Sequence, residues 1–224
     1  MLIDFAQSRV FEYLPKVILP ACLATLAMLV ISLLLSTIVG VSIAVMLTLS
    51  HPKGLAPNRY LYRIFNTLID AIRSFPAIIL IVLFTPLTRW LIGTSVGWIA
   101  AVVPLTIVAF PAVARLIENA LLEVDKNVIL AARSFGASNR QIITKVMFSE
   151  AAPAIVSSMT FASIQLLANT ALAGAVGAGG LGAVALTYGY QRFDDLMTYA
   201  VVFILSVIVL VIQYIGRITY RLFK

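Results

Sequence analysis

Ionisable side chains that could do chemistry are rare in the apolar parts of this sequence. Two of them, Asp70 and Arg73, lie near the start of one apolar stretch. Being three residues apart, they share one face of a helix and could form an ion pair. Charged residues within membrane spans often act in gating or substrate contact. We favour a structural role, either as an ion pair or with the long arginine side chain extending toward the membrane surface.

Three polar residues, Ser158, Gln165 and Asn169, occur at spacings of seven and four in a later uncharged stretch. This spacing places them close to one face of a helix, where they could line a translocation path. The alternative, which we favour, is hydrogen bonding between packed membrane helices. No carboxylate lies deep in an apolar stretch, which argues against a proton relay.

A glycine-rich run could be mistaken for a phosphate-binding loop. Its glycines are Gly174, Gly177, Gly179, Gly180 and Gly182. The run lacks the Lys-Ser/Thr pair of such a loop, and it follows a candidate span rather than a strand. We expect the small residues to allow close backbone packing or a re-entrant turn, in a loop on the external side of the membrane.

Nothing in the sequence combines a nucleophile with a base and a third group that orients it, as enzyme active sites require. His51 has no second histidine, cysteine or carboxylate at the spacing of a metal site. The single cysteine, Cys22, cannot form a disulfide within the chain. We therefore expect a chain that is not an enzyme and that holds no metal or cofactor of its own.

The composition predicts an integral membrane protein. Of the 224 residues, 62% are hydrophobic and only 11% are charged, whereas charged residues make up about a quarter of an ordinary soluble chain. The net charge of +7 is spread over segments that flank apolar stretches. This distribution favours the positive-inside pattern of membrane proteins over nucleic-acid binding. We expect no removable signal peptide ahead of the first apolar stretch.

Five transmembrane helices are predicted, because a span needs about 20 apolar residues. The first lies in the uncharged stretch from Val17 to Ser50, which is long enough to be tilted. The fourth lies in the uncharged stretch from Ala151 to Gln191, ahead of the glycine-rich loop. The others are expected near Asn66 to Pro86, Val96 to Leu116 and Leu196 to Gly216.

Two further expectations concern the segments around the third span. Arg89 to Ser95 is expected to be a short turn. Pro104 and Pro111 are expected to kink the third helix, because proline removes a backbone hydrogen bond and clashes with the preceding turn.

Basic residues predict the orientation. Leaving Arg73 aside, eleven fall on one side of the five-span arrangement: Lys53, Arg59, Arg63, Arg115, Lys126, Arg133, Arg140, Lys145, Arg217, Arg221 and Lys224. Four fall on the other: Arg9, Lys16, Arg89 and Arg192. The side richer in lysine and arginine is normally cytoplasmic. We expect an external N-terminal segment (1–16), a membrane domain (17–216) and a cytoplasmic C-terminal tail (217–224).

The stretch from Glu118 to Pro153 is the longest one dense in charge. Its apolar residues recur at helical spacing, so it reads as structured. Gly136 suits the left-handed position that ends a short helix. Ser138 can cap the next helix, with Gln141 completing a capping box. We expect a helix, a glycine turn and a second helix (118–150), exposed to water between two spans.

This stretch resembles the coupling loop of ABC-importer permeases, whose motif begins Glu-Ala-Ala and has a glycine after three further residues. The motif falls on Leu130, Ala131, Ala132 and Gly136, so leucine replaces the acidic residue, and Ser149 replaces the final proline. The resemblance implies that this segment enters a cleft of the ATP-hydrolysing subunit. The residues expected at that contact are Ala131, Ala132, Arg133, Phe135, Gly136 and Ala137.

Further segments are similar to the permeases of methionine-uptake ABC importers. These are ENALLE (118–123), GTSVG (93–97), VPLT (103–106), GAVGAGGLG (174–182) and YGY (188–190). The resemblance covers nearly the whole chain, from about Leu23 onward. It implies the all-α membrane fold of type I ABC importer permeases, in a bacterial inner membrane. It also implies import of methionine, in both L and D forms.

The partners implied by the resemblance are a second copy of the chain, two ATP-binding cassette subunits that hold ATP and Mg, and an external substrate-binding lipoprotein. Two other readings stay open. One is an importer for another amino acid or small solute, because no residue identifies a thioether. The other is an ion-coupled secondary carrier, which would need intramembrane ionisable residues or an inverted repeat. A structural membrane adaptor would leave the coupling segment without a purpose.

Overall fold

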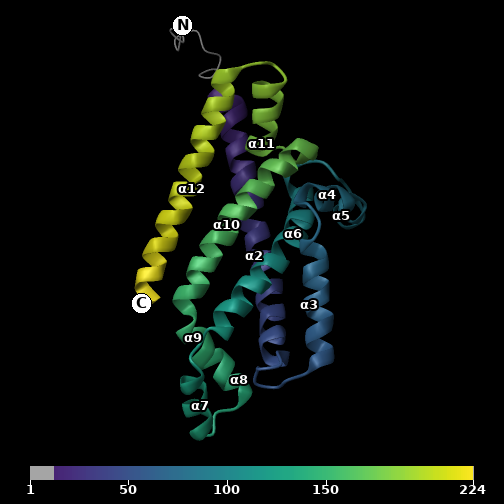
Figure 1. The fold of residues 1–224 in the computed structure, drawn as a ribbon. Coiled ribbons are helices and arrows are strands. Elements are labelled where there is room, and N and C mark those ends of the chain that lie inside the picture. The colour runs from purple at the N-terminus through teal and green to yellow at the C-terminus, as the bar shows by residue number, and fades with distance from the viewer. Residues whose placement is uncertain (1–12, 224) are drawn as a thin grey trace. The chain divides into compact units, whose positions relative to one another are not determined.

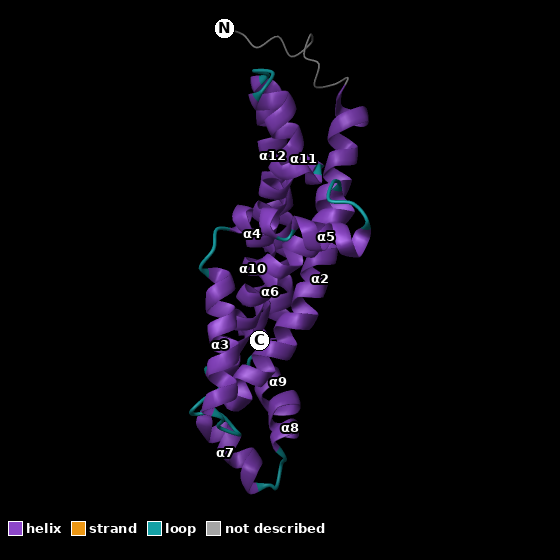
Figure 2. Cartoon of the chain, turned by 90° about the vertical axis from the view of Figure 1, so that its right-hand side faces the viewer, coloured by secondary structure: helices purple, strands orange, loops and turns teal. Residues whose placement is uncertain are grey.

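The computed structural model describes residues 13–223. These residues form helices joined by short loops (Figure 1). No strand occurs within that range (Figure 2). Four of the helices, marked η, are π-helical. In chain order the helices are η1 (Leu14–Ile18), α2 (Leu19–Ser50), α3 (Arg59–Arg73), α4 (Ala77–Leu83), α5 (Thr85–Ile92), α6 (Trp98–Leu122), α7 (Lys126–Ser134), α8 (Asn139–Gln141), η2 (Ile142–Met147), α9 (Phe148–Glu150), α10 (Ala152–Ala173), η3 (Gly174–Ala178), α11 (Gly180–Val184), η4 (Ala185–Tyr190) and α12 (Asp195–Phe223).

Within the described residues, four helical stretches are long and apolar enough to cross a membrane: Leu14–Ser50, Trp98–Leu122, Ala152–Ala178 and Asp195–Phe223. The pair α3 and α4 meets the same test jointly but is bent by 100°. Counting that pair as one broken span gives the five predicted spans. The all-helical membrane fold is therefore confirmed, and so is the unusual length of the first span.

The predicted second span, Asn66 to Pro86, is wrong as a single helix. α3 ends at Arg73 and α4 begins after Pro76. Proline has no amide hydrogen and disfavours the helical conformation in the residue before it, which accounts for the break. The turn expected at Arg89 to Ser95 is also wrong in part, because Arg89 lies inside α5.

The glycine-rich segment is only partly the loop that we expected. Its ends belong to the helical segments η3 and α11, but Val176 and Gly177 have non-helical backbone angles, and φ is positive at Gly177, Gly179 and Gly180, where the chain turns. A Cβ atom on Gly174 would lie 2.6 Å from the backbone nitrogen of Ala183. The expected close backbone packing is thus confirmed. The Leu181 amide also donates a 2.8 Å hydrogen bond to the Thr25 hydroxyl of α2.

The described residues divide into two compact units, and α2, α6, α10 and α12 each contribute to both. The core of unit 1 includes Ile18, Leu181 and Met197, from η1, α11 and α12. Unit 1 comprises 13–33, Pro76–Thr106 and Ile164–Ile212, and unit 2 comprises Leu34–Phe75, Ile107–Ser163 and 213–223. The largest core cluster of unit 2 joins α6, η2 and α10 through residues such as Leu121, Ile142 and Ala162.

Three expected boundaries differ from the structure. α6 extends to Leu122, beyond the expected end of the third span at Leu116, and it runs through Pro104 and Pro111 without a break, so the kink there stays a prediction. The N-terminal segment (1–16) lies mostly outside the described residues, and its last residues from Leu14 belong to η1. The C-terminal tail (217–224) is not a separate segment as far as it is described, because α12 extends to Phe223.

Candidate functional site

The candidate coupling segment is a helix, a glycine turn and a second helix, as predicted. The Asp125 side chain caps α7 by accepting a 2.9 Å hydrogen bond from the Asn127 amide. Gly136 follows the end of α7 with φ +80°, in the left-handed region. Ser138 and Gln141 then form a complete capping box. Both local predictions, at Gly136 and at Ser138, are confirmed.

The turn of this segment carries its most exposed aromatic side chain. Phe135 is 92% exposed, and Ala131, Arg133 and Gly136 are exposed beside it. Ala132 and Ala137 pack instead against the core of unit 2. Four of the expected contact residues, Ala131, Arg133, Phe135 and Gly136, are therefore exposed. The other two, Ala132 and Ala137, hold the segment against the core of unit 2.

Two side chains hold the coupling segment to the loop that follows α2. The Arg133 guanidinium donates to the backbone oxygen of Leu55 at 3.2 Å. The Asn139 amide donates to the same oxygen at 3.4 Å. One carbonyl group thus anchors both halves of the segment, with the exposed turn between them.

A polar cluster of unit 2, which we call the Arg115 cluster, consists of Asn66, Asp70, Arg115 and Glu118. Arg115 Nη1 donates to Glu118 Oε2 at 2.8 Å, and Arg115 Nη2 donates to Asp70 Oδ1 at 3.0 Å. Arg115 Nη2 also donates to Asn66 Oδ1 at 2.7 Å. Asn66 Nδ2 donates to Asp70 Oδ2 at 2.7 Å. The cluster joins α3 to α6.

The Arg115 cluster corrects two expectations. Asp70 forms its ion pair with Arg115, so the pairing of Asp70 with Arg73 is wrong; Arg73 is exposed and forms no ion pair within the described residues. Glu118 does not lie in a water-exposed loop but in α6, with only 1% of its surface exposed. From the sequence, Arg115 is expected only as a basic residue that flanks a span. Its spacing of three from Glu118 was the signal for one of these contacts.

The three polar residues of α10 differ in their surroundings. Ser158 is half-buried and belongs to unit 2. Gln165 and Asn169 belong to unit 1, where Gln165 is exposed and Asn169 is buried. The four-residue spacing of Gln165 and Asn169 therefore does not give them a common environment. Their role in translocation stays a prediction.

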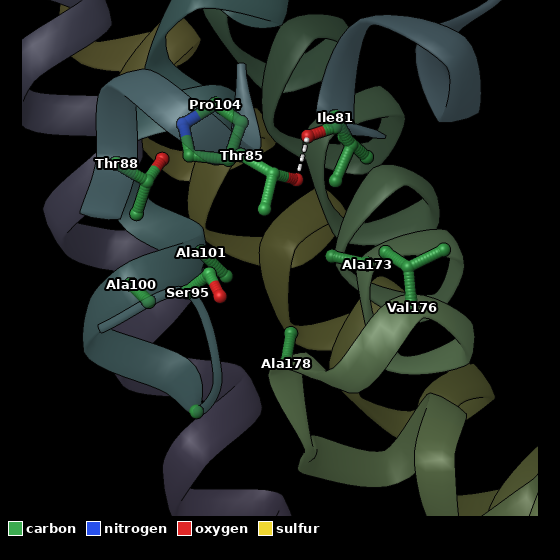
Figure 3. A pocket seen from close by; sticks show the side chains of 11 residues that line it. Ile81, Thr85, Thr88, Ser95, Ala100, Ala101, Pro104, Ala173, Val176 and Ala178 are labelled. Atoms are coloured by element: carbon green, nitrogen blue, oxygen red, sulfur yellow. Dashed lines mark hydrogen bonds between the residues drawn. The ribbon is translucent and has the colours of Figure 1, made fainter. Parts of the chain in front are cut away.

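A small cavity in unit 1 lies beside the glycine-rich segment (Figure 3). Ala173, Val176 and Ala178 line one side, and Thr85 and Thr88 line it from α5. Thr85 donates its hydroxyl to the Ile81 oxygen at 3.3 Å. The cavity volume is about 20 Å³, room for roughly one water molecule. It is too small to hold an amino acid.

Comparison with known proteins places the chain in a family. Residues 40–224 match the family described as binding-protein-dependent transport system inner membrane component. The probable D-methionine transport system permease protein MetI of Vibrio cholerae is 42% identical over 89% of this chain and 88% of its own length. The methionine import system permease protein MetP of Bacillus subtilis is 41% identical over 76% of this chain and 77% of its own length.

Solved structures agree with the sequence comparison. A chain from a native crystal form of the inward-facing MetNI methionine ABC transporter superposes with a TM-score of 0.92, covering 95% of this chain and 99% of that one at 38% identity. An amino acid ABC transporter crystallised with histidines gives a TM-score of 0.80 at 20% identity, covering 99% of each chain, and supports the fold alone. The chain belongs to the binding-protein-dependent transport system inner membrane components, the multi-pass permease subunits of ABC importers.

Proposed function

We propose that the chain is the membrane permease of an ATP-driven importer of methionine. The observation that carries this proposal is the 42% identity over 89% of the chain to a permease named for D-methionine transport. The likeness to the MetNI methionine transporter supports it. Both L- and D-methionine are proposed as substrates. The 20 Å³ cavity of unit 1 is too small for either, so we do not place the solute there.

The proposed assembly has two copies of this chain, two ATP-binding cassette subunits and an external substrate-binding lipoprotein. ATP and Mg belong to the ATP-binding subunits, and the permease supplies the path and the coupling contact. The family name, which specifies dependence on a binding protein, supports the external partner. Similarity to a chain of an ABC transporter supports the ATP-binding partners.

The proposed orientation puts the coupling segment and the C-terminus in the cytoplasm and the N-terminus outside. The excess of lysine and arginine on one side supports it. In this orientation the exposed Phe135 turn projects toward the ATP-binding subunit. Ala131, Arg133 and Gly136 border Phe135 and complete the proposed contact. Ser158, Gln165 and Asn169 are candidates for the path, and hydrogen bonding between packed helices is the role that we favour for them.

Uptake by intact cells tests the substrate. Cells that lack this chain are expected to lose high-affinity uptake of radiolabelled L-methionine, and the wild-type gene should restore it. Excess unlabelled D-methionine should compete with the restored uptake. Histidine uptake serves as the control and should not change. Unchanged methionine uptake, in a strain without another methionine carrier, would point to an importer of a different solute.

A substitution at Gly136 tests the coupling role. No atom lies within 4 Å of a Cβ built on Gly136, so a side chain there meets only backbone strain. That strain is about 1–2 kcal/mol for a left-handed L-residue. Gly136→Val is expected to insert normally but to misdirect the Phe135 turn. Transport should fall steeply, and ATP hydrolysis by the partner should no longer respond to loaded binding protein.

The matched control for this experiment is Gly136→Asn, because asparagine tolerates the left-handed region far better than valine. Transport and ATP hydrolysis are measured on the same reconstituted complex, and the asparagine variant should retain both. Full transport by Gly136→Val would show that the turn is not needed for coupling. Loss of the valine variant from the membrane would make the turn a folding element instead.

A further inference from the structure

A second cavity, in unit 2, combines positive charge with an apolar wall. Its volume is about 410 Å³. The titratable side chains that line it are Lys53, Lys126, Arg133 and His51, and none of its lining residues is acidic. Leu130 is among the apolar lining residues. We call it the basic cavity. Its lining suits a negatively charged group that is carried on an apolar stem.

The basic cavity is formed in part by two segments that are bonded to each other. Lys53 and His51 belong to the loop between α2 and α3, whereas Lys126 and Arg133 belong to α7. The Arg133 guanidinium donates to the backbone oxygen of Leu55 in that loop at 3.2 Å. Within the loop, the Lys53 amide donates to His51 Nδ1 at 3.1 Å. The two segments that carry the lysines are therefore held together before anything binds, which lowers the cost of ordering them on binding.

The lysines of the basic cavity have no counterion in the described part of the chain. Neither Lys53 nor Lys126 forms an ion pair there, and the ion pairs that occur involve Arg115. Leu130 occupies the position of the acidic residue in the coupling motif, so it supplies apolar surface where a carboxylate would supply negative charge. A concave surface lined by charges of one sign attracts the opposite charge. The complementary anion must therefore come from another molecule.

The place of the basic cavity selects its occupant. Arg133 lines the cavity and is also one of the exposed residues expected at the contact with the ATP-binding subunit. Leu130, which is 59% exposed, lines the cavity and directly precedes Ala131 of the same contact. The basic cavity thus adjoins the surface that the proposed assembly places against the ATP-binding subunit. A side chain of that subunit can reach the lysines when the two chains assemble.

We propose that an aspartate or glutamate side chain of the ATP-binding subunit enters the basic cavity. Its carboxylate accepts hydrogen bonds from Lys53 and Lys126, and its aliphatic carbons lie on Leu130. This contact has the opposite direction to the proposed coupling contact, in which the Phe135 turn of the permease enters the ATP-binding subunit. It also makes the loop after α2 part of the interface. The inference rests on the proposed assembly of this chain with an ATP-binding subunit.

Carbodiimide cross-linking of the reconstituted complex tests the proposal. This reagent joins a lysine amine to a carboxylate as an amide without a spacer, so the two groups must already be in contact. Mass spectrometry of the digested complex should show Lys53 and Lys126 each joined to the same aspartate or glutamate of the ATP-binding subunit. Lys145 is the internal control, because it is exposed but lies outside the cavity lining. Absence of cross-links from both cavity lysines, or cross-linking of Lys145 to the same acidic residue, would contradict the proposal.

Affinity for the ATP-binding subunit gives a second test. The purified permease is titrated with the purified subunit at several salt concentrations. Lys53→Gln/Lys126→Gln should raise the Kd about tenfold or more and reduce its dependence on salt, because a close charge pair across an interface is lost. The matched control is Arg140→Gln/Lys145→Gln, which removes the same charge from exposed residues outside the cavity lining and should bind nearly as the wild type does.

A further pair of variants tests the missing counterion. Leu130 is exposed, so a polar residue is tolerated there. Leu130→Glu supplies the cavity with a carboxylate of its own and should weaken binding of the ATP-binding subunit. Leu130→Gln, of nearly the same size but neutral, should bind more tightly than Leu130→Glu. Tighter binding by the glutamate variant would overturn the proposal.

The possible contrary results can be told apart. If the wild-type permease does not bind the ATP-binding subunit, the proposed assembly and this contact are both wrong. If it binds, and the cavity variant and its control lose affinity equally, only the acidic contact is wrong. If native mass spectrometry shows that the wild-type complex retains phosphatidylglycerol and that Lys53→Gln/Lys126→Gln does not, the anion is a lipid and the proposal is overturned. None of these measurements involves methionine, so failure of the substrate proposal would not affect them.

Discussion

Replacing Arg115 with alanine is expected to lower the melting temperature of the purified permease by about 10 °C. The reason is the burial of Glu118, which is 1% exposed and is bound by Arg115 at 2.8 Å. Removing one partner of a buried ion pair leaves an uncompensated charge, at a cost of about 3–5 kcal/mol. Glu118 Oε1 already lacks a hydrogen-bond partner among the described residues. Tyr62 also interacts with this carboxylate, but its neutral hydroxyl cannot replace the positive charge of the arginine.

Companion variants separate this explanation from a general loss of packing. Arg115→Met/Glu118→Met removes both charges and should recover most of the lost stability, because apolar replacement of a buried pair is often neutral. Asp70→Asn should cost less than about 1 kcal/mol, because Asp70 is 53% exposed and water can solvate its surroundings. Arg73→Ala is the control for removal of an arginine that has no ion pair.

Scanning fluorimetry in one detergent gives the melting temperatures of the wild type and the four variants under the same conditions. The order of destabilisation should be Arg115→Ala first, well above Asp70→Asn, with Arg73→Ala near the wild type. If Arg115→Ala and Arg73→Ala melt together, the Glu118 carboxylate must have another partner. If the double methionine variant is as unstable as the single alanine variant, lost packing rather than a stranded charge is the cause.

Features set by neighbouring residues could be predicted from the sequence. The left-handed Gly136 and the capping box of Ser138 and Gln141 depend on backbone preferences within a few residues. The number of spans depends on the length of apolar stretches, which composition reveals directly. Even the exposure of Phe135 agrees with its place at the end of a short helix surrounded by charge.

Features set by distant residues could not be predicted. Asp70 has an equally spaced candidate in Arg73, but its actual partner, Arg115, is 45 residues away. No local pattern ranks one arginine above the other. The position of Glu118 inside α6 was missed because a carboxylate usually marks a water-exposed segment, and only its pairing with Arg115 makes burial tolerable. Pro76 indicated the bend between α3 and α4, but the high hydropathy of the whole stretch favoured a single span.

Gly182→Ala is expected to have the second large effect on folding. Its cause is a steric clash with a neighbouring helix rather than an unfavourable backbone conformation. A Cβ at Gly182 would contact the backbone oxygen of Ala171 and would lie 2.6 Å from the Ala171 Cα. These atoms belong to the backbone of α10, so no side-chain rotation can relieve the overlap. The methyl group must push α11 away from α10. Overpacking in a well-packed interior costs about 1–3 kcal/mol, and more where nothing can yield.

The matched control is Gly177→Ala in the same glycine-rich segment. Gly177 has φ +100°, but no atom lies within 4 Å of a Cβ built there. The Gly177→Ala variant has backbone strain but no steric clash, so its free energy of unfolding should fall by only about 1–2 kcal/mol. Size-exclusion profiles of fluorescent fusions and methionine uptake should therefore show Gly182→Ala largely misfolded or inactive, with Gly177→Ala folded and active. The reverse order would mean that the turn at Gly177 matters more than the contact between α10 and α11. Equal, mild effects would mean that the two helices can separate at little cost.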